Sequence, residues 1–161
     1  MNEIVLTELK KIKFKKNIFR HNVSGLDNEL TQRYNMKIGY PCHSFTFGTR
    51  TRKDKNLLSV ASIKYADLYQ LLKDYIKELD PEFKYTHITV NKNIVCKPHT
   101  DSNNTSVSLA IGLGEYTGGN LYIKGVPHNI RYKPVIFDGA QEHWTDEFEG
   151  ERYSLIYYSR Q

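Results

Sequence analysis

Apolar and polar residues alternate through most of the second half of the chain, in short runs separated by turn residues. Alternation at period two turns one side of each run toward a core and is typical of β-strands. Turns recur at roughly ten-residue intervals, which favours a β-sandwich or jelly roll. The predicted strands cover residues 85–90, 94–96, 106–113, 120–123, 134–137 and 153–158.

The first half carries a helical pattern. Apolar residues return at three- and four-residue intervals from Ser62 to Leu79, and Pro81 then disfavours a helical conformation for Asp80. This pattern predicts a helix that packs on the outside of a sheet. Two further stretches, within 9–20 and 42–48, are predicted as strands, and residues 21–40 as a loop with a short helix at most.

Length and composition predict one domain spanning 1–161, with N-terminal strands and a supporting helix in 1–80 and a β core in 81–161. The net charge of +5 and the basic segments 10–16 and 50–55 suit an anionic partner, although solubility or protection of a sheet edge explains them equally well. Two cysteines are too few for a disulfide framework. Without a secretory signal or a run of membrane-spanning length, we expect a soluble, intracellular protein.

The candidate chemistry begins at Lys97-Pro98-His99-Thr100-Asp101. Two residues apart on a strand, His99 and Asp101 would point to the same face. An imidazole and a carboxylate on one face are two of the three ligands of a facial triad on non-haem Fe(II). The motif predicts a metal site if a second histidine arrives from a distant strand.

Among the remaining histidines His143 is the best candidate, because Arg152 and Ser154 follow it on the predicted final strand. Two residues apart, they share a face, and a guanidinium with a hydroxyl forms an anchor for a carboxylate. The alternative is that His143 is a turn residue and Arg152 an ordinary surface cation.

The order of His99, Asp101, His143, Arg152 and Ser154 resembles the Fe(II)/2-oxoglutarate-dependent dioxygenases. The resemblance implies a mainly β protein, a double-stranded β-helix (a cupin-like jelly roll) with flanking N-terminal helices and a catalytic core in 81–161. It also implies that the two histidines and Asp101 bind Fe(II), and that Arg152 and Ser154 hold the distal carboxylate of 2-oxoglutarate. O₂ would be consumed, ascorbate could support the reaction, and no catalytic residue beyond the metal site is assigned.

A narrower similarity, over 99–104, 113–121 and 148–155, is to the TET/JBP group, which oxidises the methyl group of 5-methylcytosine or thymine in nucleic acid. It implies that Asn104 contacts the target base and that Tyr158 stacks on it. The base would be flipped or single-stranded. The implied partner is nucleic acid, DNA rather than RNA, with no membrane association and a monomeric state. The chain departs from animal members at Arg160, where they have a histidine, and lacks their cysteine-rich zinc-binding region.

Two other readings stay open on the sequence. A peptide or small-molecule hydroxylase of the same superfamily would share the metal and cosubstrate residues, and a non-catalytic binding module could keep the fold. Trp144 could line the pocket or belong to the core. Asn91 and Asn93 could reach the cosubstrate or be polar loop residues.

Overall fold

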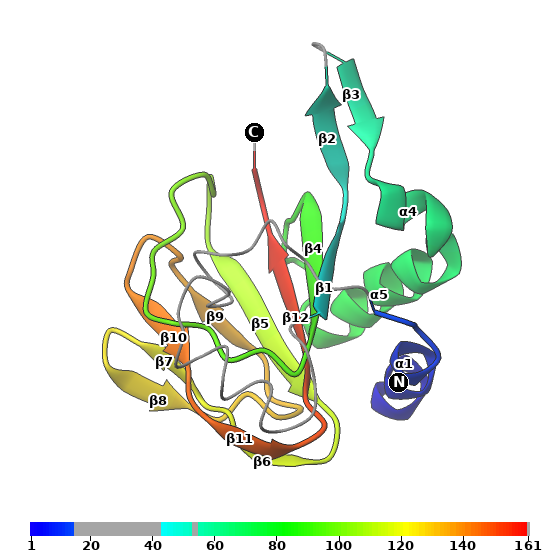
Figure 1. Ribbon diagram of the computed structural model, residues 1–161. Helices are drawn as coiled ribbons and strands as arrows, with labels where there is room; N and C mark the ends of the chain where they lie inside the picture. The colour runs from blue at the N-terminus through cyan, green and yellow to red at the C-terminus, as the bar shows by residue number, and fades with distance from the viewer. Residues whose placement is uncertain (15–42, 53–54, 161) are drawn as a thin grey trace.

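A five-stranded antiparallel sheet forms the centre of the computed structural model, which describes residues 1–14, 43–52 and 55–160 (Figure 1). Strands that are far apart in the sequence are neighbours in this sheet, so both halves of the chain contribute strands to it. The strand order is β1 (His43–Phe47), β4 (His87–Lys92), β12 (Tyr153–Tyr158), β5 (Ser108–Leu113) and β9 (Val135–Phe137).

Smaller antiparallel sheets form a second layer. An apolar cluster joins the layers, in which Ala110 and Phe137 of the large sheet pack with Leu121 and Ile123. The two layers are those of the predicted jelly roll. The strands of the second layer are β10 (His143–Thr145), β7 (Leu121–Ile123) and β8 (Val126–His128) in one sheet, and β11 (Phe148–Gly150) with β6 (Tyr116–Gly118) in another.

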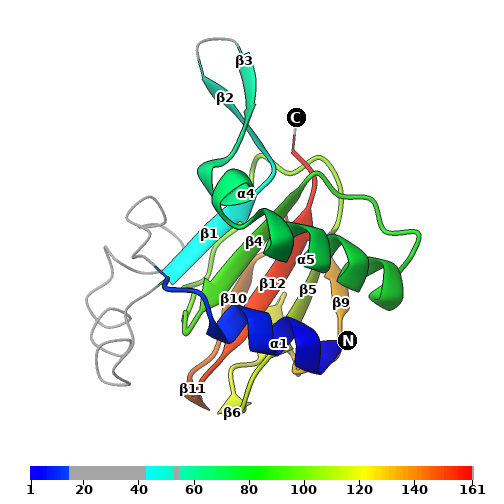
Figure 2. The same ribbon diagram turned by 90° about the vertical axis from the view of Figure 1, so that its right-hand side faces the viewer.

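Helices cover the other face of the large sheet (Figure 2). They are α1 (Asn2–Lys10), α4 (Val60–Lys64) and α5 (Ala66–Leu79). The sheet presents an apolar face to them because its strands alternate: Val90 and Leu155 are fully buried against Val5 and Leu72. Tyr157 also reaches this layer, where its hydroxyl donates a hydrogen bond to the Leu72 carbonyl at 2.7 Å.

The same alternation gives the opposite face of the large sheet a polar centre. On β4 the alternate residues are Thr89 and Asn91, and the register places Ser154 of β12 opposite Asn91. The Asn91 amide donates to the Ser154 hydroxyl at 3.1 Å. Thr46 of β1 and Thr89 are hydrogen-bonded across the strands at 3.0 Å. A hydrogen-bonded polar surface therefore lies inside the jelly roll.

A two-stranded hairpin, β2 (Thr49–Arg52) and β3 (Lys55–Leu58), projects from the end of the sheet at which β12 ends (Figures 1 and 2). No strand is predicted from the sequence in the basic segment 50–55. Thr49 and Thr51 are β-branched and suit strand pairing, which explains the difference.

Two predictions in the first half need correction. The helix predicted from Ser62 to Leu79 is two helices, because Tyr65 leaves the helical region with φ −116° and ψ 45°. The strand predicted within 9–20 is not found in the described part of that stretch, where α1 extends to Lys10 and Leu9 buries its side chain in the core. Residues 12–14 form no strand, and residues 15–42, with most of the predicted loop, lie outside the described residues.

Further differences lie in the second half. Residues 94–96 form no strand, and β8, β10 and β11 were not predicted. Alternation of apolar and polar residues cannot be recognised over only three residues. These short strands form because other strands of the fold pair with them. In the part of the chain that the structure describes, none of the helices has the length and apolar character needed to cross a bilayer.

Replacing Leu72 with alanine is expected to lower the free energy of unfolding by about 2–5 kcal/mol, because it opens a cavity between α5 and the sheet. Leu72 is completely buried. Ile63→Ala is the matched control, since the Ile63 side chain is 68% exposed and its loss should cost under ~0.5 kcal/mol. Denaturant unfolding of both variants tests this; equal losses would place the core elsewhere.

Candidate functional site

His99 and His143 are neighbours through their backbones. The amide of each donates to the carbonyl of the other, at 3.1 and 3.0 Å. The amide of Asp101 donates to Gly139 at 2.8 Å. The prediction that His99 and Asp101 share a regular strand is wrong, because the segment pairs with β10 at a single bridge. Pro98 has no N–H to donate, which discourages a longer ladder.

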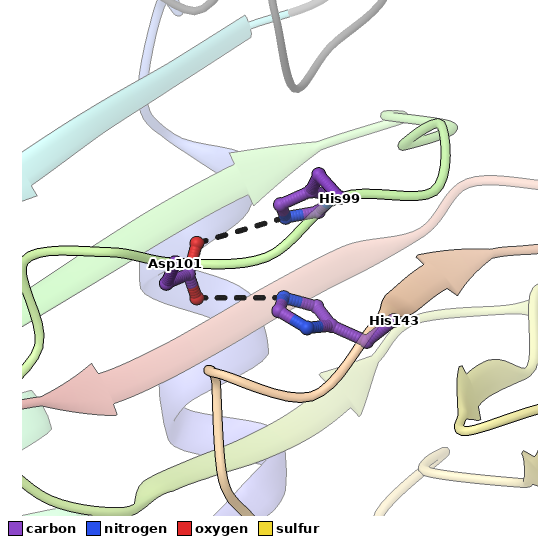
Figure 3. A group of neighbouring side chains, drawn as sticks. All are labelled: His99, Asp101 and His143. Carbon is purple, nitrogen blue, oxygen red and sulfur yellow. Dashed lines mark ion pairs between the residues drawn. The ribbon is translucent and has the colours of Figure 1, made fainter.

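The three side chains converge on one point (Figure 3). Asp101 Oδ1 lies 3.7 Å from His99 Nε2, and its Oδ2 lies 3.4 Å from His143 Nε2. One ligand atom from each residue can be chosen so that all lie within 4.8 Å of one another. His143 is buried, whereas the Asp101 side chain is 33% exposed. The group is thus held from one side and open on the other.

The second nitrogen of each imidazole fixes its orientation. His99 Nδ1 lies 2.7 Å from the Lys97 carbonyl, and His143 Nδ1 lies 2.8 Å from the Gln141 carbonyl. A carbonyl only accepts, so both Nδ1 atoms carry hydrogen, and both Nε2 atoms are turned toward Asp101, where they can serve as metal ligands. Such second hydrogen bonds are usual for metal-binding histidines.

The electrostatics of the group favour a cation at its centre. Burial lowers the pKa of His143, but the hydrogen bond to Asp101, the Gln141 carbonyl and the Asp101 charge together raise it above the ordinary value for histidine. The carboxylate therefore draws positive charge to the place where the Nε2 atoms meet. Two imidazoles and one carboxylate, with an open side, are the donor set of a non-haem Fe(II) facial triad.

Gly139 keeps space for the Asp101 carboxylate. A Cβ added there would lie 2.9 Å from Asp101 Oδ2 and 3.3 Å from the Asn104 amide nitrogen. Gly139→Ala is therefore expected to displace the carboxylate and weaken Fe(II) binding about tenfold, the lower end of the effect of disturbing a ligand's surroundings. Metal titration tests this. Gly125→Ala is the control for general strain, because a Cβ there meets nothing within 4 Å although φ is +79°.

Arg152 is a buried cation with little to balance it. Its side chain is 3% exposed, its Nη2 donates to the Gly119 carbonyl at 3.1 Å, and its Cζ lies 5.4 Å from the centre of the Tyr116 ring. Among the described residues no carboxylate pairs with it, and its Nε has no hydrogen-bond partner. Burial lowers the pKa of the guanidinium, an effect that Tyr116 partly opposes.

Two residues around Arg152 support it. Asn93, with φ 54°, accepts the Arg152 backbone amide through its Oδ1 at 2.7 Å. Gly119 has φ +67°, and a Cβ there would lie 2.8 Å from Arg152 Nε. Gly119 is thus required both by the close approach of the buried arginine and by its own positive φ.

Asn104 and Tyr158 line the same cavity as the His-Asp-His group. The cavity measures about 520 Å³, and Arg152 and Ser154 also line it. The Tyr158 ring stacks on His87 with a centroid separation of 5.5 Å, and its hydroxyl accepts a hydrogen bond from Thr89 at 3.3 Å. All seven predicted site residues therefore meet in one cavity.

Several supporting residues escaped sequence reasoning: His87, Gly119 and Gly139. Only Gly119 gave a signal in the sequence, as part of the Gly118-Gly119 dipeptide. His87 and Gly139 act on residues that are brought close to them only by the fold. Trp144 lines the cavity, where it is half-buried and stacks on Tyr122 with a centroid separation of 4.9 Å, rather than lying in either core cluster. Of the basic segments, 15–16 and the side chains of 50–55 lie outside the described residues.

Comparison with known proteins places the fold. No family model matches the chain, and no curated protein sequence matches it. Among solved structures, NgTET1 in complex with 5mC DNA matches with a TM-score of 0.60 and 16% identity, over 85% of this chain and 68% of that one.

A second match is an oxidoreductase of the 2OG-Fe(II) oxygenase family from Burkholderia pseudomallei, with a TM-score of 0.51 and 20% identity, over 73% of this chain and 67% of that one. A Pseudomonas putida prolyl-4-hydroxylase is a more remote likeness, with a TM-score of 0.43 and 16% identity over the full length of both chains. The chain therefore has the jelly-roll fold of the 2-oxoglutarate and Fe(II) oxygenases, with a TET-like similarity, and the fold predicted from the sequence resemblance is confirmed.

Proposed function

We propose that this protein is an Fe(II)/2-oxoglutarate-dependent dioxygenase that hydroxylates the methyl group of a 5-methylpyrimidine, 5-methylcytosine or thymine, in nucleic acid. One observation carries the proposal: a single cavity receives both the His-Asp-His group and a buried arginine that pairs with no acid among the described residues. A metal ion would satisfy the first and an anionic cosubstrate the second.

His99, Asp101 and His143 would hold the metal, and their open side leaves room for further ligands. Arg152 and Ser154 would hold the distal carboxylate of 2-oxoglutarate. Arg152 lines the cavity, and its guanidinium could donate hydrogen bonds to such a carboxylate. When bound, Fe(II) and 2-oxoglutarate would supply the oxidising chemistry that hydroxylates an unactivated C–H bond with O₂.

The remaining residues orient the substrate and exclude water. Asn104 offers an amide that can pair with the edge of a base, and Tyr158 offers a ring that can stack on its face. The His87 stack and the Thr89 hydrogen bond hold that ring still. A base inside a duplex does not reach a recessed site, so the substrate base is extruded or single-stranded.

The likeness to NgTET1 in complex with 5mC DNA supports a nucleobase as substrate, as does the basic charge of +5. We further propose that residues 1–161 act as one monomeric catalytic domain, with 81–161 carrying the chemistry and the preceding helices supporting it. DNA is proposed as the polymer rather than RNA.

The test incubates the protein with Fe(II), 2-oxoglutarate, ascorbate and oligonucleotides that carry 5-methylcytosine or thymine, single- and double-stranded. Nucleoside mass spectrometry is expected to find a product heavier by one oxygen atom, absent with His99→Ala. Succinate formation is measured in parallel. Succinate without an oxidised base would favour a peptide or small-molecule hydroxylase, and neither product would favour a binding module.

A further inference from the structure

A second cavity adjoins the candidate active site. It measures about 460 Å³ and shares four lining residues with the larger cavity. Its lining consists of Ser102, Asn103, Asn104, Thr105 and Arg160. All of these are polar, and one is a cation. The shared wall begins directly after the proposed metal ligand Asp101, so the two cavities are separated by one short loop.

The backbone of this loop is fixed to the end of β12. Asn104 pairs with Arg160 in an antiparallel bridge, and the Thr105 amide donates to the Ser159 carbonyl at 2.9 Å. The Arg160 amide in turn donates to the Thr86 hydroxyl at 3.0 Å. These bonds occupy main-chain groups, so the positions of the lining residues are set before any ligand arrives.

The side chains are left available. Arg160 is exposed, and in the described part of the chain it forms no ion pair. The Ser102, Asn103 and Thr105 side chains likewise have no hydrogen-bond partner among the residues described. The cavity therefore offers a guanidinium fork, two hydroxyls and amide groups.

Anionic ligands suit this lining best. Among the residues that the structure describes, none that lines the smaller cavity carries a carboxylate. A guanidinium fork matches the oxygens of a phosphate, and hydroxyl and amide side chains are frequent phosphate contacts. Two extended residues span at most about 7 Å, so Asn103 stays within that distance of Asp101 from Cα to Cα.

We propose that this second cavity is a phosphodiester subsite, in which Arg160 and the 102–105 loop bind a backbone phosphate next to the nucleotide whose base enters the larger cavity. The inference rests on the proposed function, because it assigns a nucleic acid strand to the site. It adds a contact that carries no sequence information but fixes the strand relative to the metal.

Fluorescence anisotropy with a single-stranded methylated oligodeoxynucleotide tests the subsite. Arg160→Gln is expected to weaken binding about tenfold at low salt, the value of one charged hydrogen-bonded contact. The slope of log affinity against log salt should fall by about 0.7, as for one phosphate on a single strand. Arg160→Lys should recover part of the affinity, since it keeps the charge without the fork.

Lys77→Gln is the matched control. It removes the same charge from an exposed position on α5, the helix on the other face of the sheet. If Lys77→Gln lost as much affinity as Arg160→Gln, the loss would reflect the net charge of the protein, and the proposed subsite would be overturned. Failure of the wild-type protein to bind the oligonucleotide would overturn it as well.

A neutral methylphosphonate introduced next to the methylated base, one linkage at a time, locates the contact. At one linkage the substitution should weaken wild-type binding but have little further effect on Arg160→Gln, because both changes remove the same contact. Additive losses at every linkage would overturn the proposal. Base oxidation is scored separately, so binding with this coupling but without oxidation would reject the proposed function and retain the subsite.

Discussion

Replacing Arg152 with methionine is expected to weaken 2-oxoglutarate binding by at least about 100-fold, equivalent to about 3 kcal/mol, because it removes a charge-assisted fork in a buried site. The only tryptophan of the chain, Trp144, lines the same cavity, so its fluorescence can report the titration. The titration is made in the presence of Mn²⁺, which occupies such sites without turnover. Calorimetry provides an independent measurement.

The same substitution is expected to leave the thermal midpoint unchanged or to raise it when 2-oxoglutarate is absent. A buried guanidinium without an acidic partner costs desolvation energy that a methionine of similar length avoids. Ser154→Ala should weaken 2-oxoglutarate binding only about tenfold, the lower end of the value of one hydrogen bond to a charged group. An Arg152→Met variant that still binds 2-oxoglutarate tightly would show that the buried cation serves another purpose.

Replacing Asp101 with asparagine is expected to reduce Fe(II) affinity by more than about 100-fold and to abolish turnover. The carboxylate is the only negative charge in the His-Asp-His group, and both imidazole Nε2 atoms face it. The expected loss follows from the hard carboxylate ligand that Fe(II) prefers beside two imidazoles. Metal content after anaerobic loading and desalting measures it.

Thermal unfolding gives a second measurement of the same change. Fe(II) at a hundred times its dissociation constant should stabilise the wild-type protein by about 2.7 kcal/mol, and this stabilisation should vanish in Asp101→Asn. Glu142→Gln is the control, since Glu142 is an exposed acid directly before His143. Equal metal loss in both variants would point to general charge rather than to a defined ligand.

The sequence predicted the large sheet better than the parts around it. Strand β4, for example, alternates polar and apolar residues from His87 to Asn91, long enough for periodicity to be visible. The second layer is built from three-residue strands, whose existence depends on partners that only the tertiary structure supplies. Ile12 and Phe14 were assigned to a strand because they alternate with lysines, yet the residues just before them form α1, whose apolar side packs in the core with the large sheet.

The candidate site could be predicted from the sequence because its residues come in short motifs that follow one another in a fixed order. His99, Asp101 and His143 are chemically distinctive, and Arg152 with Ser154 follows them in a fixed order. What the sequence could not indicate is which groups leave room for these side chains. Gly139 and Asn93 act through a single close approach or one hydrogen bond, and such effects have no periodicity or characteristic composition.

In strand β12, odd-numbered and even-numbered residues serve different purposes, so substitutions at the two sets have different consequences. Its odd-numbered residues, Tyr153, Leu155 and Tyr157, belong to the core beneath the helices, while Ser154, Ile156 and Tyr158 line the cavity. Substitutions at Ile156 and Tyr158 can therefore alter substrate preference while the residues at odd positions keep the core unchanged. An insertion of one residue would exchange the two sets, so the strand should tolerate substitutions at even positions far better than any change in length.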